Sequence, residues 1–334
     1  MKKYLKVSLL FLLLVNIITL CSCKKEKDVQ KSFPEIVTNL KSYKLSGKLE
    51  SMFPSGNKEC EVVAYYKSPN LYRVELKNVG NNEPQIMIKN QDGIYVLLPS
   101  VNKMFKINSS WPNNSSYPYL LQSLSKDIVS DEQLLTSKDE NTTTLEFNAK
   151  LFDNAVAIKQ KAIFDNKTGL PKEVLVYDEK DTLITRFVVS NIEIDIDIDK
   201  KLFEVNSTMT ENRQTYINSP IAFDRVVSYP TYYPEGATMQ SENILGSANE
   251  KKVIMKYGGE NPFTIIESYI VGTETLKTEY LDATIYTMGG AMCFIANNTI
   301  KFYDNGMEYI LASTTIDYPT LIQMGESLRT ADLK

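Results

Sequence analysis

The sequence predicts an α+β fold, in which a curled antiparallel half-barrel with lid helices is followed by a smaller C-terminal α+β domain. Three observations lead to this prediction. Apolar residues recur at every second position through most of the chain after Tyr43, which is typical of half-buried strands. Turn sequences such as Asn90–Gly93 separate these runs, as in antiparallel hairpins. Helical spacing is confined to short stretches, whose apolar faces need a sheet to cover.

The N-terminal residues have the pattern of a bacterial lipoprotein signal. Lys2 and Lys3 precede an apolar run from Val7 to Leu20, and the segment Leu20–Cys23 reads as a lipobox. In this pattern a peptidase cuts before the cysteine, and the cysteine thiol carries acyl chains. Two alternatives stay open, an uncleaved membrane anchor and an ordinary secretory signal, although the apolar run is short for a span of about 20 residues.

We therefore expect residues 1–22 to be a lipoprotein signal peptide and residues 23–32 to be a tether. Cys23 is the predicted lipidation site, with acyl chains of the palmitate type. Because each buried methylene contributes about 0.8 kcal/mol, two or three chains anchor a protein without a spanning helix. The predicted location is the extracytoplasmic face of the cell membrane, and the membrane is the first expected partner.

The predicted half-barrel covers residues 33–206. It opens with a short helix after Phe33, and a second helix is expected over 119–130. The alternating runs that predict its strands are 43–50, 61–67, 71–76, 84–89, 94–98, 143–148, 156–164, 173–177 and 183–198. An antiparallel sheet of this width curls over one face, so the helices are expected to fill the concave side as a lid.

The C-terminal part is expected to form a separate unit. Residues 207–218 lack apolar periodicity and predict a linker, and residues 219–334 predict the small α+β domain. Its expected strands are 252–257, 264–271, 283–286, 293–296, 300–303 and 307–311. Asn305–Gly306 is a strong hairpin signal, and 318–328 has the spacing of a closing helix.

Several motifs of the first domain occur in the order found in one known family. The chain contains Lys67–Leu71 at the end of a strand, an Asp92–Gly93 turn, Pro99, Met104–Lys106, and a closing Asp199–Glu204 segment. These motifs resemble the LolA-like family, the outer-membrane lipoprotein-carrier fold also found in sigma-factor regulatory proteins. The resemblance implies a half-barrel that binds lipid, a lipoprotein or an apolar peptide in the cell envelope, and it implies no enzymatic activity.

The second domain is similar to an uncharacterised small domain of Gram-positive sporulation lipoproteins. Tyr233–Gly236, the hairpin at Asn305–Gly306 and the helix at 321–328 carry this similarity. It implies a role in sporulation, and a shorter germination lipoprotein of the same family implies an alternative, an adaptor that escorts a cell-wall hydrolase such as an amidase. Lipid-carrying members have an arginine that latches the lid where this chain has Ser68, and Arg73 cannot be assumed to replace it.

Alternation of apolar residues predicts which side chains line the concave surface. Such a surface would accept acyl chains or an apolar peptide. The candidate lining residues are Val62, Ala64, Ile86, Ile88, Tyr95 and Leu97. The aromatic loop from Trp111 to Tyr119 either lies at the mouth of this cavity or simply covers the sheet.

Composition narrows the function further. The chain has no histidine, which removes the usual general base and most zinc sites, and no catalytic residue, metal site or cofactor is predicted. A net charge of −4 and a pI of about 5.3 argue against nucleic acid. Cys60 and Cys293 are expected to be buried free thiols. Ile192–Asp199 alternates acids with isoleucines, which predicts a strand with its carboxylates on one face rather than a calcium site.

Overall fold

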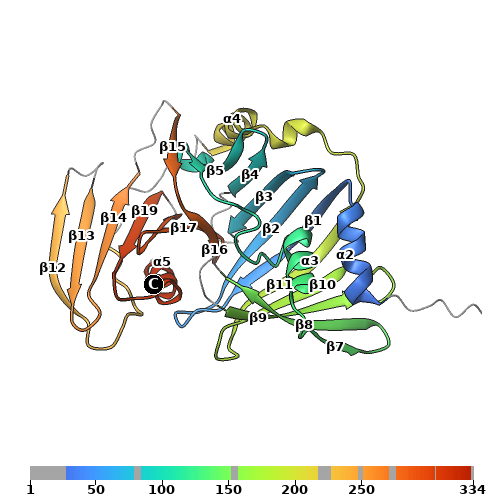
Figure 1. Cartoon of the computed structure of the whole chain (residues 1–334). Coiled ribbons are helices and arrows are strands. Elements are labelled where there is room, and N and C mark those ends of the chain that lie inside the picture. Colours follow the sequence, from blue (N-terminus) through green and yellow to red (C-terminus); the bar gives the residue numbers. More distant parts are fainter. Residues whose placement is uncertain are drawn as a thin grey trace, which may run out of the picture.

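The computed structural model describes residues 28–78, 84–151, 157–216, 227–246, 251–270, 276–304 and 306–331. Within this part of the chain two sheets lie side by side and helices pack on their faces (Figure 1). The predicted lipidation site Cys23 and the rest of the signal and tether up to residue 27 lie outside the described residues. The predominance of sheet over helix and the curled antiparallel sheet predicted from the sequence are confirmed.

The larger sheet has twelve strands in the order β15-β6-β5-β4-β3-β2-β1-β11-β10-β9-β8-β7. Neighbouring strands run antiparallel, apart from the parallel pair β15 and β6. The strands are β1 (Ser42–Ser51), β2 (Lys58–Lys67), β3 (Leu71–Asn78), β4 (Pro84–Asn90), β5 (Gly93–Leu98), β6 (Lys103–Ile107), β7 (Leu135–Lys138), β8 (Thr142–Lys150), β9 (Ala157–Asp165), β10 (Pro171–Tyr177), β11 (Leu183–Ile194) and β15 (Lys277–Leu281).

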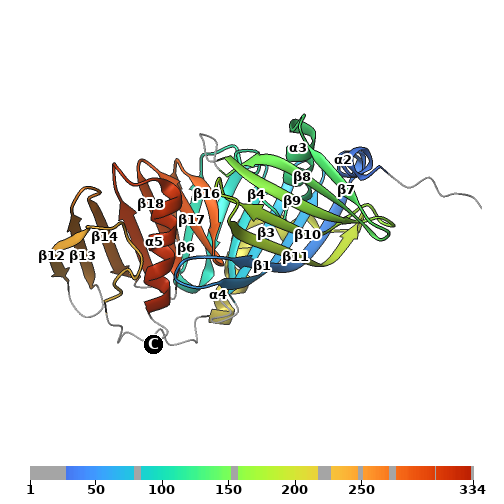
Figure 2. The same cartoon turned by 90° about the horizontal axis from the view of Figure 1, so that it is seen from below.

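The smaller sheet has seven strands in the order β12-β13-β14-β19-β18-β17-β16. The strands are β12 (Thr238–Leu245), β13 (Lys252–Gly258), β14 (Phe263–Tyr269), β16 (Thr284–Met288), β17 (Ala291–Ala296), β18 (Thr299–Asp304) and β19 (Met307–Ala312). Helix α5 (Tyr318–Ala331) lies on one face of this sheet (Figure 2). Gly325 permits this close approach, because a Cβ there would stand 2.9 Å from the Phe302 ring.

Two helices lie on the concave side of the larger sheet. They are α2 (Val29–Asn39) and α3 (Leu121–Ser130). Val29, Phe33 and Val37 recur at four-residue spacing, so α2 buries one face, with the Phe33 ring 4.9 Å from that of Phe164. The apolar core under these helices continues into residues of β16, β17 and β18, so side chains of both sheets contribute to it.

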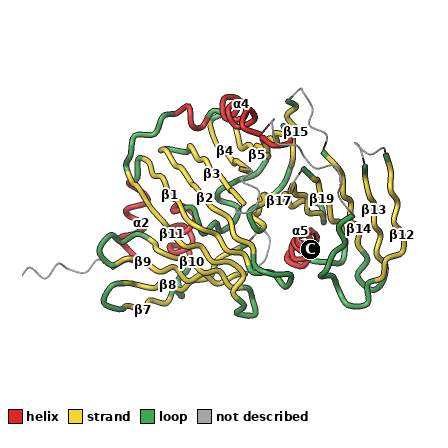
Figure 3. Tube along the Cα trace, turned by 180° about the vertical axis from the view of Figure 1, so that it is seen from behind, coloured by secondary structure: helices red, strands yellow, loops and turns green. Residues whose placement is uncertain are grey.

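The 3-10 helix η2 (Lys200–Phe203) and helix α4 (Val205–Tyr216) lie on the opposite, convex side of the larger sheet (Figure 3). Another short 3-10 helix, η1, spans Pro99–Val101. Residues 207–216, within the segment predicted as a linker, are helical and belong to α4, which ends at Tyr216. The sequence did not predict this helix because, among its residues up to Arg213, only Thr208 and Met209 are buried, which gives no periodic apolar pattern.

Several strands differ from the prediction. The last strand of the first half was expected to reach residue 198, but β11 ends at Ile194, because Asp195 adopts a left-handed conformation with φ of 53°. The carboxylates of Ile192–Asp199 consequently do not all lie on one strand face. Strand β15 was not predicted, and it joins residues of the C-terminal part to the larger sheet. The division into domains at 207–218 stays a prediction.

Candidate functional site

The concave side of the larger sheet is the site predicted from the sequence. Strand register identifies the side chains that point to this inner face. Ala64 pairs with Val74, Val74 with Met87, and Met87 with Val96. All of these residues belong to the core beneath α2 and α3, together with Val62. Val62 and Ala64 therefore lie on the predicted surface, where both are fully buried.

The other four candidate residues lie on the convex, outer face. Ile88 pairs with Arg73 and with Tyr95. Each of these three residues is next in sequence to one that points inward, so their own side chains point outward. Ile86 and Leu97 form a neighbouring pair on the same outer face and pack against η2 and α4. The prediction that all six side chains line one concave surface is wrong, because a shift of one residue moves a side chain to the opposite face of a strand.

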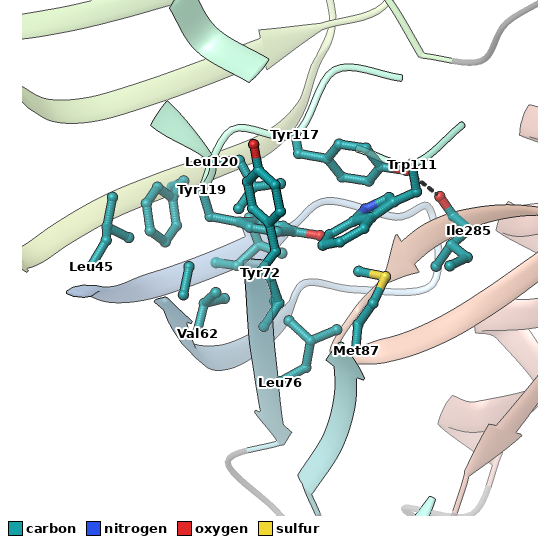
Figure 4. Packing of buried hydrophobic residues seen from close by; sticks show 14 of the residues in the cluster. Leu45, Val62, Tyr72, Leu76, Met87, Trp111, Tyr117, Tyr119, Leu120 and Ile285 are labelled. Carbon is teal, nitrogen blue, oxygen red and sulfur yellow. Dashed lines mark hydrogen bonds between the residues drawn. The ribbon is translucent and has the colours of Figure 1, made fainter. Parts of the chain in front are cut away.

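The inner face is filled by aromatic side chains of the chain itself (Figure 4). The Trp111 side chain is completely buried, with its ring centroid 5.6 Å from that of Tyr72 and 6.2 Å from that of Tyr117. Lys89 Nζ donates a hydrogen bond of 2.9 Å to the Trp111 carbonyl, and partial burial lowers the pKa of Lys89. The segment containing Trp111 and Tyr117 thus packs as core rather than standing at an open mouth.

Hydrogen bonds fasten this aromatic loop to the smaller sheet. The Tyr117 hydroxyl donates to the carbonyl of Ile285 at 2.8 Å, and the hydroxyls of Tyr119 and Thr287 are 2.7 Å apart. Burial raises the pKa of Tyr119 well above its usual range. Because buried hydroxyls need partners, these bonds favour one fixed position of the loop.

A second connection between the sheets lies next to the first. Gln85 Nε2 donates to the carbonyl of Tyr303 at 2.9 Å, and its Oε1 accepts from the Met292 amide at 2.7 Å. The Phe105 ring is 4.9 Å from that of Phe294. Strands of the smaller sheet therefore close the end of the inner face that the helices do not cover.

Arg73 holds elements on the outer face, where it is only 6% exposed. Its Nε donates to Glu75 Oε1 at 2.6 Å, and its Nη1 donates to the Leu202 carbonyl and to Thr208 Oγ1 at 2.9 and 2.7 Å. These bonds fix η2 and α4 to the sheet. Arg73 cannot latch a lid over the concave side, because it lies on the other side of the sheet.

Cavities open at the surface near the exposed side chain of Tyr280. One of about 460 Å³ lies between β5, β6 and the end of β15, and one of about 420 Å³ lies between β6, β15 and the start of α4. Lys106 and Tyr280 line both of them. Such concave surfaces beside an exposed aromatic side chain suit contact with another protein.

A third cavity, of about 480 Å³, lies between α3 and β8. Asp127 lines it and is nearly buried. Burial raises the pKa of Asp127 to about 6, against the lowering effects of a hydrogen bond with Ser116 and the charge of Lys126.

Other sequence-based expectations concern thiols, metals and the membrane. Cys60 and Cys293 are buried and, over the described residues, neither forms a disulfide, as predicted. Over the described ranges, no group of three or more cysteine and acidic side chains could hold a metal ion. None of the helices in the same ranges is long and apolar enough to cross a bilayer.

The protein consists of two sheets whose side chains share one apolar core that closes the inner face. Comparison of the sequence with known families shows to which family the chain belongs. The family model described as "Sporulation protein YdcC-like" matches residues 1–203. The chain belongs to this family, so its predicted similarity to sporulation proteins is confirmed. A relative named sporulation protein YdcC, from Bacillus subtilis, is 28% identical over 333 residues, which cover 98% of each chain.

Solved structures give a more distant likeness. A complex of MucA and MucB from Pseudomonas aeruginosa matches 90% of this chain and 97% of its own, with 12% identity and a TM-score of 0.32. A LolA superfamily protein from Nitrosomonas europaea matches 55% of this chain and 98% of its own, with 11% identity and a TM-score of 0.34. Scores this low say nothing about function.

Proposed function

We propose that this chain is a lipid-anchored, non-enzymatic binding protein that acts at the extracytoplasmic face of the cell membrane during sporulation and binds a protein partner with its outer surface. Membership of a sporulation family supports the process. The lipobox ending at Cys23 supports the anchor, and the absence of histidine from the sequence supports a binding role.

We favour a protein partner over a lipid because the inner face of the half-barrel is closed. A lipid could enter only if Trp111 and Tyr117 left the core. Exposing each large side chain costs about 1.5–3 kcal/mol, and breaking the hydrogen bond from Tyr117 to Ile285 costs about 1 kcal/mol. A partner that binds outside the half-barrel meets none of these costs. A cell-wall hydrolase such as an amidase is one class of partner that fits this proposal.

The anchor is tested by metabolic labelling with an alkyne fatty acid in sporulating cells. The wild-type protein and Cys21→Ala should incorporate the label, whereas Cys23→Ala should not. Cys21 is a matched control because it lies in the signal peptide, two residues before the lipidation site. Labelling of Cys23→Ala equal to that of the wild type would contradict the proposed anchor.

The choice of partner is tested by native mass spectrometry of residues 24–334 purified without detergent from the source cells. We expect the mass of the polypeptide without bound lipid. A lipid mass that is retained under native conditions and lost on denaturation would make the half-barrel a lipid carrier and would overturn the proposal.

A further inference from the structure

Strand β12 is the free edge of the smaller sheet and is poorly covered. None of its eight residues is buried, whereas neighbouring β13 buries Val253, Met255 and Tyr257 beneath the α5 side. Figures 1 and 2 both show β12 beyond the reach of α5. The core side of the sheet therefore continues onto a strand that α5 does not cover, where the Tyr229 hydroxyl donates a hydrogen bond to Glu242.

Apolar side chains stand on both faces of this edge. Ile244 pairs with buried Val253 and is itself 54% exposed on the α5 side. Leu245 pairs with Lys252 and is 51% exposed on the other side, which we call the open face. An added strand would meet an aliphatic side chain whichever way its own side chains point.

The usual protection of an edge strand is weak here. Segment Thr238–Leu245 contains no lysine, arginine or proline, the residues that most often prevent edge pairing. The register shift between Met239 and Ser241 distorts one end of the strand, but Ser241–Leu245 pairs regularly with Lys252–Lys256. Five residues in regular geometry are enough for a short strand to bind beside them.

Charge on the open face indicates the partner. On this face β12 presents Ser241, Asn243 and Leu245, and β13 presents Lys252, Ile254 and Lys256. The surface thus has two exposed lysines and no carboxylate. Across the described residues no salt bridge pairs either lysine with an acid. Carboxylates at alternate positions of an added strand would lie within reach of both lysines, since Lys and Glu side chains are long.

The position of the predicted lipid anchor disfavours a membrane surface as the partner that covers the β12 edge. Cys23 precedes the first described residue, Asp28, by five residues, a reach of at most roughly 18 Å. The chain leaves the structure beside α2, at the end of the molecule opposite β12 (Figure 1). A membrane holding Cys23 is therefore expected near α2 rather than near β12.

The charges on the open face also disfavour a second copy of this chain as the occupant of the β12 edge. Pairing of two β12 strands about a two-fold axis perpendicular to the sheet would put Lys252 and Lys256 of both copies on the same face. Neither copy would supply a carboxylate to them there. A different protein with acidic residues meets this surface better than the chain meets itself.

We propose that the free edge of β12, over Ser241–Leu245, binds an extended segment of a partner protein in which aliphatic and carboxylate side chains alternate. The segment pairs with the β12 backbone, directs aliphatic residues toward Ile244, and directs carboxylates toward Lys252 and Lys256. This inference rests on the proposed function, because it gives the binding site for the protein partner.

The probe is a fluorescent peptide of alternating isoleucine and glutamate, measured by anisotropy against the full chain without its signal and anchor residue. A peptide of the same composition in scrambled order is the control. We expect saturable binding of the alternating peptide and at least about tenfold weaker binding of the scrambled one, because only alternation separates the two faces of a strand.

Two variants test the two parts of the site. The pair Lys252→Glu and Lys256→Glu should weaken binding at least about tenfold, while Lys172→Glu with Lys180→Glu, exposed lysines that give the same net charge elsewhere, should change it less than about twofold. Ile244→Ser with Leu245→Ser should also weaken binding. Unchanged urea midpoints would show that the variants are folded, as expected for exposed positions.

Three outcomes would overturn the inference. The first is equal binding of the alternating and scrambled peptides, and the second is weakening by the charge variants without any effect of Ile244→Ser and Leu245→Ser. The third is binding to vesicles of anionic lipid, or dimerisation measured by light scattering, that needs Lys252 and Lys256 while the peptide does not bind. Each leaves the proposed function standing, because that function fails only on the anchor and lipid measurements.

Discussion

The inner face of the larger sheet and the free edge of the smaller sheet differ in what covers them. The inner face is closed by α2, α3, the aromatic loop and strands of the other sheet, and Trp111 at its centre is completely buried. At the free edge, α5 covers β18 and β19 but leaves Ile244 and Tyr233 about half exposed. Both regions are rich in apolar and aromatic side chains.

The difference teaches that apolar content alone does not mark a binding site. Side chains with every neighbour in place contribute to the stability of the fold, and a ligand must displace them before it binds. Side chains left half exposed on a strand with free backbone groups are available without rearrangement. Substitutions in the two regions should therefore affect different measurements, stability in the first and binding in the second.

The largest effect is expected from Trp111→Ala. Removing a fully buried tryptophan leaves a cavity next to Tyr72 and Tyr117 and should lower the free energy of unfolding by about 3–5 kcal/mol. Tyr233→Ala, at the free edge, should change it by less than about 1 kcal/mol. Urea denaturation followed by circular dichroism measures both. Similar losses for the two variants would remove the distinction between the regions.

A smaller effect is expected from Arg73→Met. The change removes three hydrogen bonds of a buried guanidinium group and should destabilise the protein by about 2–3 kcal/mol. Amide exchange should accelerate most in α4, since Arg73 holds Thr208. The control Arg186→Met removes an exposed ion pair with Glu173 and should cost at most about 1 kcal/mol. Unchanged exchange in α4 would show that other contacts hold the helix.

The strands could be predicted because most of them have one polar face. Strands β1, β2 and β8 alternate buried and more exposed positions, and the sequence placed them correctly. In β4, however, Pro84–Ile88 are all buried, since α4 and η2 cover the outer face as the core covers the inner one. A run of Ile86, Met87 and Ile88 does not say which residue points inward, and the wrong choice of face followed from that.

Long-range pairing could not be predicted from local pattern. Strand β15 is five residues long and pairs in parallel with β6, more than 170 positions earlier in the chain. Nothing in Lys277–Leu281 itself specifies that neighbour. The same holds for the closure of the inner face, which depends on side-chain hydrogen bonds from Gln85 and Tyr117 to residues of the smaller sheet.

Asp127→Asn should change stability in a pH-dependent way. Burial raises the pKa of the Asp127 carboxyl to about 6, above the value of about 4 expected in the unfolded chain. The protonated form therefore contributes stability that is fully present below about pH 4 and is lost as the pH rises through about 6. At pH 8 the variant should be more stable than the wild type, by on the order of 2 kcal/mol.

Urea midpoints measured from pH 4 to pH 8 would check this expectation. The difference between Asp127→Asn and the wild type should shrink toward zero near pH 4, because the carboxyl is then neutral in both states. Glu132→Gln, on an exposed neighbouring residue, is the control and should show no such trend. If the stability difference between Asp127→Asn and the wild type stayed constant from pH 4 to pH 8, ionisation of the buried carboxyl would not be the cause of that difference.

The smallest effect compares single hydroxyl groups in the two regions. Tyr117→Phe removes the donor to the Ile285 carbonyl and leaves that buried acceptor without it, so the loss should be about 1–2 kcal/mol. Tyr229→Phe removes a bond of 2.7 Å to Glu242 at the free edge, where water replaces the hydroxyl and the loss should be under about 0.5 kcal/mol. Both rings keep their apolar contacts in the variants. If the dependence of the unfolding free energy on urea concentration is unchanged, the shift in the urea midpoint therefore measures the loss of the hydrogen bond alone. Equal losses would mean that water reaches the junction between the sheets, and the inner face would then be less closed than its packing indicates.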